Sequence, residues 1–170
     1  MNVRLFAVLT ALIPCAGLAA GDAAQARLLD AQGKQVGTAR ITPAEGGVRI
    51  EAQVSDLPPG KHAFHIHATG KCEGPDFKSA GPHFNPTQRK HGHENPEGPH
   101  AGDLPDIDVG QDGKADVSVV AKGVSLSSGK GSLFGESGTA LVVHAKPDDG
   151  KTDPAGNAGD RIACGVIERR

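Results

Sequence analysis

Short segments in which apolar and polar residues alternate are the feature of this sequence that most restricts its fold. Over residues 48–54 every second side chain is apolar, and those between are Arg49, Glu51 and Gln53. Because successive side chains of a strand point to opposite faces, this pattern is typical of an antiparallel sheet with one solvated face. No stretch with helical periodicity and useful length competes with it.

Eight such segments are bounded by turns rich in Gly or Pro, for example 31–34, 57–60 and 111–114. The chain has 24 glycines and 12 prolines in 170 residues, which allows many reversals within a length that suits one domain. We therefore expect an all-β fold, an eight-stranded antiparallel β-sandwich. The expected strands are 26–30, 36–42, 48–54, 63–67, 107–109, 115–121, 140–145 and 162–167.

The first residues differ from the rest of the chain. Arg4 is followed by an apolar run that continues through Ile13 and then by small residues. This is typical of a secretory signal peptide, and the run is too short to span a bilayer comfortably. We expect residues 1–20 to be this signal, cleaved near 19–24, and 21–170 to be one soluble periplasmic domain that makes no membrane contact. Acylation of Cys15 is the alternative, which Pro14 directly before it disfavours.

The cysteine count predicts one disulfide. Of three cysteines, Cys15 leaves with the signal peptide, and Cys72 and Cys164 remain as a pair in an oxidising compartment. Closing a loop of ~92 residues removes about 4 to 5 kcal/mol of unfolded-state entropy in the loop-closure account. The alternative is two free buried thiols.

The charge and aromatic content argue against nucleic acid as a partner. The formal net charge is −2, and only 3% of the residues are aromatic, with no Trp or Tyr. Such a chain has neither the basic stripe nor the stacking side chains that nucleic-acid binding needs.

Two stretches, about 68–103 and 146–160, lack periodicity and are far longer than the usual loop of four to six residues. Long loops in a compact domain are normally functional. These loops hold most of the unusual side chains, so we expect metal to order them. The side chains are His83, His91, His93, His100, Asp103, Lys146, Asp148, Asp149, Lys151 and Asp153.

Further histidines lie on predicted strands. His65 and His67 alternate with Phe64 and Ile66, so both imidazoles share one face while the apolar pair enters the core. His144 ends another predicted strand. Imidazoles suit copper and zinc, and a carboxylate among three histidines suits tetrahedral zinc.

The histidines belong to motifs that occur in a recognisable order: F-H-I-H, G-P-H-F-N-P, K-H-G, H-A-G-D-L, V-V-H-A-K-P-D-D and G-N-A-G-D-R-I-A-C-G-V-I. In these motifs the chain resembles the copper,zinc superoxide dismutases over essentially its whole mature length. The resemblance implies a Greek-key β-sandwich or barrel with two long functional loops. The spacings between His67, Cys72 and His83 differ from the eukaryotic pattern and indicate the bacterial branch.

The resemblance also implies a role for each matching residue. Asp148 is similar to the carboxylate that hydrogen-bonds one histidine from each metal site, and Arg161 to the arginine that docks the anion. Arg161 and His83 are thereby the catalytic residues, and Cys72 and Cys164 match the disulfide. The implied copper ligands are His65, His67, His83 and His144, and the implied zinc ligands are His83, His91, His100 and Asp103, with His83 shared.

The implied activity is dismutation of superoxide to dioxygen and hydrogen peroxide, with one copper and one zinc per chain and a possible homodimer. His62 and His93 match no ligand position and are expected at the surface or behind the ligands. Lys146 and Lys151 are candidates for steering the substrate. Two alternatives stay open: a related domain that stores or delivers copper without turnover, and a structural sandwich that binds zinc alone.

Overall fold

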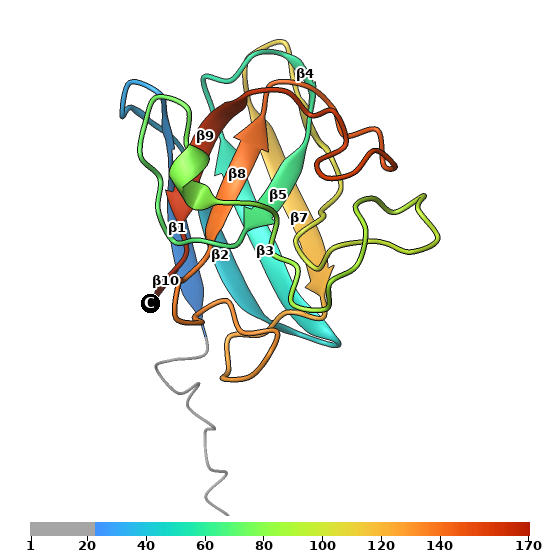
Figure 1. Cartoon of the computed structure of the whole chain (residues 1–170). Coiled ribbons are helices and arrows are strands. Elements are labelled where there is room, and N and C mark those ends of the chain that lie inside the picture. Colours follow the sequence, from blue (N-terminus) through green and yellow to red (C-terminus); the bar gives the residue numbers. More distant parts are fainter. Residues whose placement is uncertain (1–22) are drawn as a thin grey trace, which may run out of the picture.

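The computed structural model describes residues 23–170, which form antiparallel strands joined by loops of very unequal length (Figure 1). The predicted signal peptide and Cys15 lie outside these residues. The elements are β1 (Ala24–Asp30), β2 (Gln35–Ala44), β3 (Gly47–Val54), β4 (Gly60–His62), β5 (Phe64–His67), the 3-10 turn η1 (Lys78–Ala80), β6 (Ile107–Val109), β7 (Ala115–Lys122), β8 (Ala140–His144), β9 (Arg161–Val166) and β10 (Glu168–Arg169).

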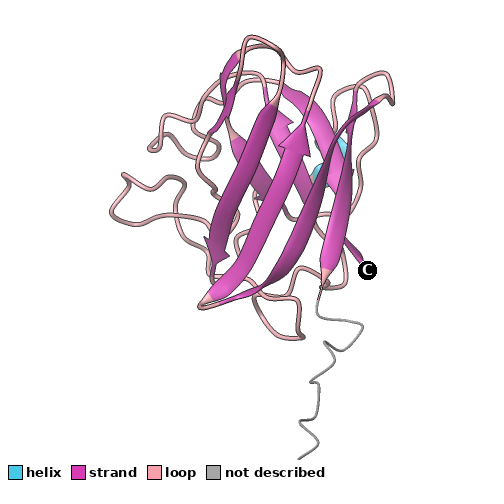
Figure 2. Ribbon diagram, turned by 180° about the vertical axis from the view of Figure 1, so that it is seen from behind, coloured by secondary structure: helices cyan, strands magenta, loops and turns pink. Residues whose placement is uncertain are grey.

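The main sheet is continuous and curls over itself, so that its two ends face each other as two layers (Figures 1 and 2). Its strand order is β5-β8-β9-β1-β2-β3-β7, with β10 paired to β1, and β4 and β6 pair separately. β7 lies beside β3 although β4, β5 and β6 come between them in the chain. Such a return past intervening strands is the Greek-key connection.

The alternation that predicts β3 is visible in its burial. Along β3 exposed side chains alternate with buried ones, and the strand pairs with β2 on one side and β7 on the other. The buried side chains pack between the layers, since only one face of each strand is solvated. The largest fully buried apolar side chains of this core are Leu28, Ile41, Ile50, Phe64, Ile66, Leu133 and Leu141.

All eight predicted segments form strands, and the expected all-β sandwich is confirmed. The predicted strand 63–67 corresponds to β5. A further short strand, β4, precedes it, and Ala63 separates the two. The division separates two pairings, because β4 pairs with β6 whereas β5 pairs with β8. β10 at the end of the chain is a short addition that the pattern did not predict.

A second, smaller core lies on the outer face of β8 and β9. Phe77 and Ala80 of the first long loop pack there on Ala140, Val142 and Cys164. Cys72 and Cys164 form a disulfide with a Cα–Cα distance of 5.6 Å, which confirms the predicted bond. The start of the loop is thus attached to the sheet by both a covalent bond and apolar packing.

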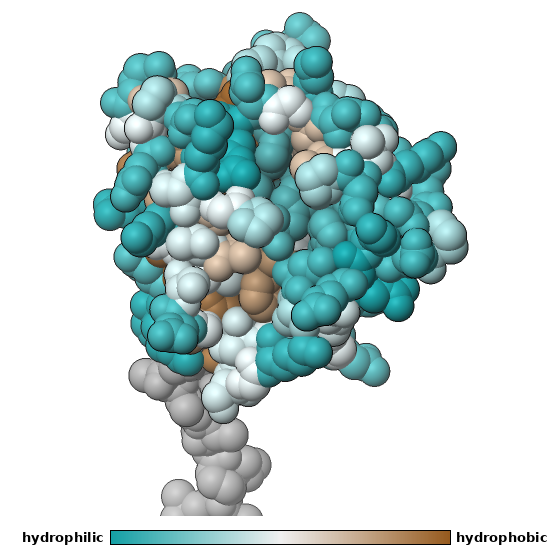
Figure 3. All heavy atoms as spheres, in the orientation of Figure 1, coloured by the Kyte–Doolittle hydropathy of each residue, from teal (hydrophilic) through white to brown (hydrophobic). Residues whose placement is uncertain are grey.

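The part of the first long loop that follows η1 and the second long loop both extend from the right-hand side of the sandwich in Figure 1. The face of these loops that Figure 3 shows is largely hydrophilic. Within residues 23–170, the structure contains no helix long and apolar enough to cross a membrane.

Candidate metal centre

The histidines of β5 lie on its outer face, as the alternation predicts. Phe64 and Ile66 enter the main core, while His65 and His67 are fully buried under the loops on the opposite face. β5 pairs with β8, which places His65 opposite Val142 and His67 opposite Ala140. The two-residue period of β5 determines the spacing of the two imidazoles, and the pairing determines their position relative to β8.

The first long loop pairs with the free edge of β5. The backbone N–H of Ile66 donates to the carbonyl of Gly102 (2.9 Å), and the N–H of Phe84 donates to the carbonyl of Ile66 (2.8 Å). Isolated bridges result between His65 and Asp103 and between His67 and His83. Backbone bonding thus brings two loop residues beside the two histidines of the strand.

His144 arrives from β8 at the point where the sheet is irregular. The pairing of β8 with β9 shifts between Val143 and His144, after which His144 faces Arg161. The N–H of His144 donates to the carbonyl of Ala63 (2.9 Å). The sheet register therefore places the arginine next to this histidine.

The site contains two groups of potential ligand atoms, and within each group these atoms lie within 4.8 Å of one another. All members are buried, and His83 belongs to both groups. We call them the strand-side group (His65, His67, His83 and His144) and the loop-side group (His83, His91, His100 and Asp103).

In the strand-side group the outward ring nitrogens are bonded to protein acceptors. His65 Nε2 donates to Asp148 Oδ2 (2.7 Å), and His67 Nδ1 to the Gly81 carbonyl (2.8 Å). His144 Nδ1 lies 3.3 Å from the Gly159 carbonyl. The inward Nε2 atoms of His67 and His144 are only 3.3 Å apart. A nitrogen that donates outward leaves the other with a lone pair, which is the tautomer a metal ligand needs.

In the loop-side group the nitrogens gather around one carboxylate oxygen. Asp103 Oδ1 lies 2.8 Å from His83 Nδ1 and 3.2 Å from the Nδ1 atoms of both His91 and His100. Asp103 Oδ2 accepts the backbone N–H groups of Gly92 and His100, each at 2.9 Å. Three nitrogens and one oxygen converging in this way are the donor set of a tetrahedral zinc site.

Three buried ring nitrogens test whether metals fit these groups. Among the described residues, the buried side-chain atoms without a hydrogen bond are His65 Nδ1, His83 Nε2 and His91 Nδ1. Burying a polar atom without a partner costs about 1 to 3 kcal/mol. The first two atoms belong to the strand-side group and the third to the loop-side group, so a metal in each would satisfy all three.

Asp148 joins the two groups. Its Oδ2 accepts from His65 (2.7 Å) and its Oδ1 from His91 Nε2 (2.9 Å), so one carboxylate orients a histidine of each group. The backbone N–H of Asp148 donates to Asp106 Oδ1 (3.1 Å). Gly156 lies against the hydrogen bond between Asp148 and His91. A Cβ on Gly156 would collide with Asp148 Oδ1 and approach His91 Nε2 to 2.7 Å.

The two long loops approach each other most closely at Gly92. This residue has φ +98°, and a Cβ on it would overlap the carbonyl of Gly150. The glycine of the K-H-G motif is therefore required twice, by its backbone conformation and by the lack of space. It allows the loop that carries His91 to lie against the loop that carries Asp148.

Burial keeps the strand-side imidazoles neutral. Desolvation lowers the pKa of His65 to about 4, of His67 to about 2 and of His144 to about 3, and the hydrogen bond to Asp148 only partly opposes the shift at His65. Neutral imidazoles have the lone pairs that copper or zinc binds.

In the loop-side group burial also lowers the pKa of His100, but His91 shifts in the opposite direction. Burial also disfavours charge on His91, but the carboxylates of Asp103 and Asp148, one beside each ring nitrogen, outweigh this and raise the pKa of His91 to about 9. Burial acts to raise the pKa of Asp148, but the hydrogen bonds from His65 and His91 hold it well below its usual range. Without metal a proton on His91 balances these carboxylates, and a metal cation must displace that proton.

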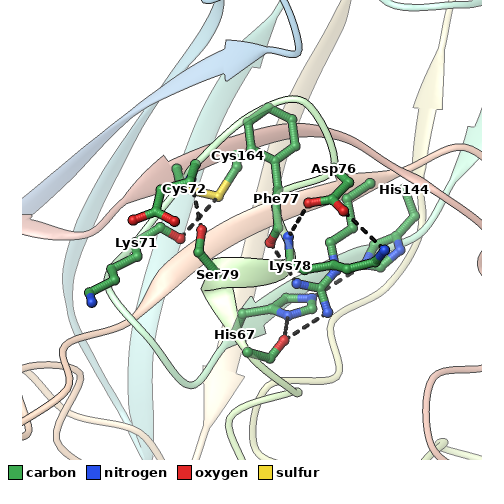
Figure 4. The surroundings of a disulfide bond; sticks show 12 residues. His67, Lys71, Cys72, Asp76, Phe77, Lys78, Ser79, His144 and Cys164 are labelled. Carbon is green, nitrogen blue, oxygen red and sulfur yellow. Dashed lines mark hydrogen bonds and ion pairs between the residues drawn. A yellow bond between two sulfur atoms is a disulfide. The ribbon is translucent and has the colours of Figure 1, made fainter.

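Arg161 lines a pocket of about 450 Å³ together with Pro75, Asp76, Lys78, Gly159 and Asp160. Its Nη1 donates to the Phe77 carbonyl and its Nη2 to the Gly81 carbonyl, both at 2.7 Å. The Gly81 carbonyl also accepts from His67, so a single backbone oxygen connects the guanidinium to the strand-side group. Figure 4 shows the Asp76 to Ser79 segment together with the disulfide, His67 and His144.

The histidines without a predicted ligand role differ from each other. His62 is buried, and its two ring nitrogens each lie 2.8 Å from a carbonyl oxygen, of His144 and of Pro58. It supports the backbone of a strand-side histidine from behind. His93 is exposed, with Nε2 3.1 Å from the Asp103 carbonyl. Neither residue is a member of the strand-side or the loop-side group.

The pocket at Arg161 is lined by a lysine that was not predicted, and the steering role of Lys146 and Lys151 stays a prediction. Lys151 is paired with Glu94 (3.0 Å), and Lys146 is exposed, but neither lines the pocket at Arg161. Lys78 lines it and is paired with Asp76 (3.0 Å). Sequence reasoning missed Lys78, as well as Asp106 and Gly156. Asp106 contacts a residue far away in the chain, Gly156 lies against His91 of the other loop, and Lys78 lines the pocket beside its neighbour Asp76, and no periodic pattern points to any of the three.

Comparison with known proteins identifies the family. Residues 35–167, which contain every member of both groups, match the family described as copper/zinc superoxide dismutase. The chain belongs to the copper/zinc superoxide dismutase family. The resemblance seen in the motifs is thereby confirmed, and the two histidine groups suit the copper and zinc sites of this family.

Several relatives in this family come from bacteria. The chain is 53% identical over 145 residues to Cu-Zn superoxide dismutase 1 of Aquifex aeolicus (strain VF5), and the matched segment covers 84% of this chain and 86% of that protein. A crystal structure of a double mutant of a SOD-like protein from Bacillus subtilis has 44% identity and a TM-score of 0.82, covering 84% of this chain and 95% of the other. The Cu/Zn superoxide dismutase from Brucella abortus has 33% identity and a TM-score of 0.68, covering 86% and 99%.

Proposed function

We propose that this chain dismutates superoxide to dioxygen and hydrogen peroxide, with copper in the strand-side group and zinc in the loop-side group. The observation that carries the proposal is the shared, buried His83. Its Nδ1 lies in the loop-side group, 2.8 Å from Asp103, and its Nε2 lacks a partner on the strand side. One imidazole that offers a nitrogen to each group suits a bridge between two metals.

The ligand assignment follows from the donor atoms. Four imidazoles without a carboxylate suit copper, whereas three imidazoles with Asp103 suit tetrahedral zinc. Asp148 holds the tautomers of His65 and His91 so that each keeps a lone pair on Nδ1. One copper and one zinc per chain result.

Copper, when bound, supplies the one-electron chemistry that oxidises one superoxide ion to dioxygen and reduces the next. The residues of the chain provide the other requirements. Arg161 docks the anion with a permanently charged, planar donor group that the carbonyls of Phe77 and Gly81 hold in place. His83 would hold one proton at Nε2 between the half-reactions and give it up as hydrogen peroxide forms, and solvent water would supply the second proton.

The local charge in the pocket at Arg161 must attract superoxide although the chain is net negative. The formal charge is −2 overall, which repels superoxide at long range. Arg161 and Lys78 line the same pocket and provide local positive charge, and Asp76 and Asp160 oppose it. Focusing by the cations has to exceed the repulsion for capture to be fast.

We also propose that residues 1–20 direct export to the periplasm and that residues 21–170 form the mature domain. The apolar run of the N-terminus and the disulfide support this, because disulfides persist in oxidising compartments. Mass spectrometry of the protein recovered from the periplasmic fraction measures the first residue. An intact N-terminus there, or a lipid on Cys15, contradicts the proposed cleavage.

The possible homodimer is tested by light scattering on the same sample. A mass of two chains would support it, and a mass of one chain would contradict it.

The decisive test combines metal content with activity. Elemental analysis of the purified protein is expected to give one copper and one zinc per chain, with superoxide dismutation that rises when copper is added to copper-poor protein. Both metals bound without turnover would instead favour a copper-handling domain. Zinc alone, without copper uptake, would favour a structural zinc sandwich.

A further inference from the structure

A second pocket opens next to the loop-side group, separate from the pocket at Arg161. It has a volume of about 380 Å³, and its lining includes His83 and His100 together with Arg89, Lys90 and Asp153. The two pockets have no lining residue in common. The loop-side group therefore has an opening of its own.

His100 is the loop-side residue most open to this pocket. Its side chain keeps 8% of its exposure, compared with 3% for His83, 1% for Asp103 and none for His91. On the strand side, His65 and His67 are fully buried. A small ion or chelator thus reaches the loop-side group with the least rearrangement from the pocket that His100 lines.

Asp153 closes one edge of this pocket. Its Oδ1 accepts the backbone N–H of His91 (2.7 Å), and its Oδ2 is paired with Lys90 Nζ (3.2 Å). Asp153 belongs to the second long loop, whereas Lys90 and His91 belong to the first. One carboxylate thus holds two neighbouring residues of the other loop, one of which carries a loop-side imidazole.

We propose that zinc enters and leaves the loop-side group through this second pocket, and that Asp153 is the positioning residue that slows its exchange by holding His91. The inference rests on the proposed zinc site. Release of zinc needs a ligand to move away, and Asp153 and Asp148 hold His91 at its backbone and its ring. Without Asp153, the backbone at residues 90–91 loses its contact with the second loop at the pocket edge.

The experiment measures the rate at which EDTA removes zinc from the fully metallated protein, with the copper visible absorption recorded in parallel. Asp153→Ala is expected to release zinc about ten-fold faster or more, in line with the 10- to 100-fold effects of residues that orient metal ligands. Asp153→Asn is expected to recover most of the wild-type rate, because its amide oxygen still accepts the His91 N–H. Lys90→Met removes only the ion pair and is expected to have a small effect.

Glu94→Gln is the matched control. It breaks the Glu94–Lys151 ion pair, another exposed contact between the same two loops that does not line the pocket. Release from this variant is expected at the wild-type rate. Equal acceleration in Asp153→Ala and Glu94→Gln would show general loosening of the loops and overturn the assignment to Asp153, as would wild-type release from Asp153→Ala.

The route is tested with a bulky maleimide on a single introduced cysteine. A label on Gln88→Cys, at the second pocket, is expected to slow zinc release, and a label on Lys78→Cys, at the Arg161 pocket, is not. The reverse result would overturn the route. A wild-type protein that binds no zinc contradicts the proposed function, whereas zinc that is bound and leaves independently of Asp153 and Gln88 contradicts only this inference.

Discussion

The strand-side and loop-side groups share His83 but are built in different ways. Three of the four strand-side residues lie on β5 and β8, whose register is determined by ladder hydrogen bonds and a buried core. All four loop-side residues lie between positions 83 and 103 of one long loop, and side chains and glycines of a second loop hold them. The sheet therefore preorganises the first group, whereas the second depends on contacts between loops and on its metal.

The largest expected effect comes from the residue that the two groups share. His83→Ala removes one ligand from each group, so the affinities for copper and zinc are both expected to fall by more than the roughly 100-fold that a supporting residue can account for. Competition titrations with chelators measure both affinities. Loss of zinc with unchanged copper affinity would show that the strand-side group is complete without His83.

Gly156→Ala tests the contact that connects the two groups. The added Cβ collides with Asp148 Oδ1, so the carboxylate must leave His65, His91 or both. We expect a loss of about 10- to 100-fold in metal affinity, larger for zinc than for copper, because β5 still holds His65. Gly33→Ala is a control at another glycine with positive φ, where a Cβ meets nothing within 4 Å. Equal losses for both metals would contradict the difference between the groups.

Arg161→Ala separates substrate capture from metal binding. The guanidinium is in neither group, so both metals are expected to stay bound while dismutation slows by about ten-fold or more, the range that local charge focusing supplies. Activity measured against ionic strength checks the cause, because the variant's rate should depend less on salt. A full wild-type rate at low salt would disprove the docking role.

The metal-free protein should show opposite pH dependences at the strand-side histidines and at His91 of the loop-side group. The folded-state pKa values of His65, His67 and His144 lie below the unfolded value of 6.5, so their contribution to stability is present above pH 6.5 and is lost as the pH falls toward 4. The pKa of His91 is raised to about 9, so its contribution is complete below pH 6.5 and is lost as the pH rises through 9.

Thermal unfolding of the metal-free protein from pH 4 to 9.5 measures this smallest effect. The melting temperature is expected to be highest near neutral pH. His91→Gln should flatten the decline above pH 6.5 and leave the acid decline in place. An unchanged alkaline decline in this variant would show that His91 is not its source.

The sequence predicts the strand-side group better than its surroundings, for a physical reason. The alternation in Phe64 to His67 specifies which side chains enter the core, and the sheet carries that pattern directly into three dimensions. The loop-side residues follow no period, and it is the family resemblance of their motifs that points to them. Asp153 accepts the backbone N–H of His91, 62 positions away, and Asp106 accepts that of Asp148, 42 positions away. No local sequence pattern encodes hydrogen bonds between residues this far apart.

With His83 in both groups, each of the proposed metals would be an effector of the other. Binding at one group would orient the imidazole that the other group needs, so the two affinities would form a closed thermodynamic cycle. The factor by which zinc strengthens copper binding must then equal the factor by which copper strengthens zinc binding. A cell that supplies only one of the metals would thereby also set how readily the protein accepts the second.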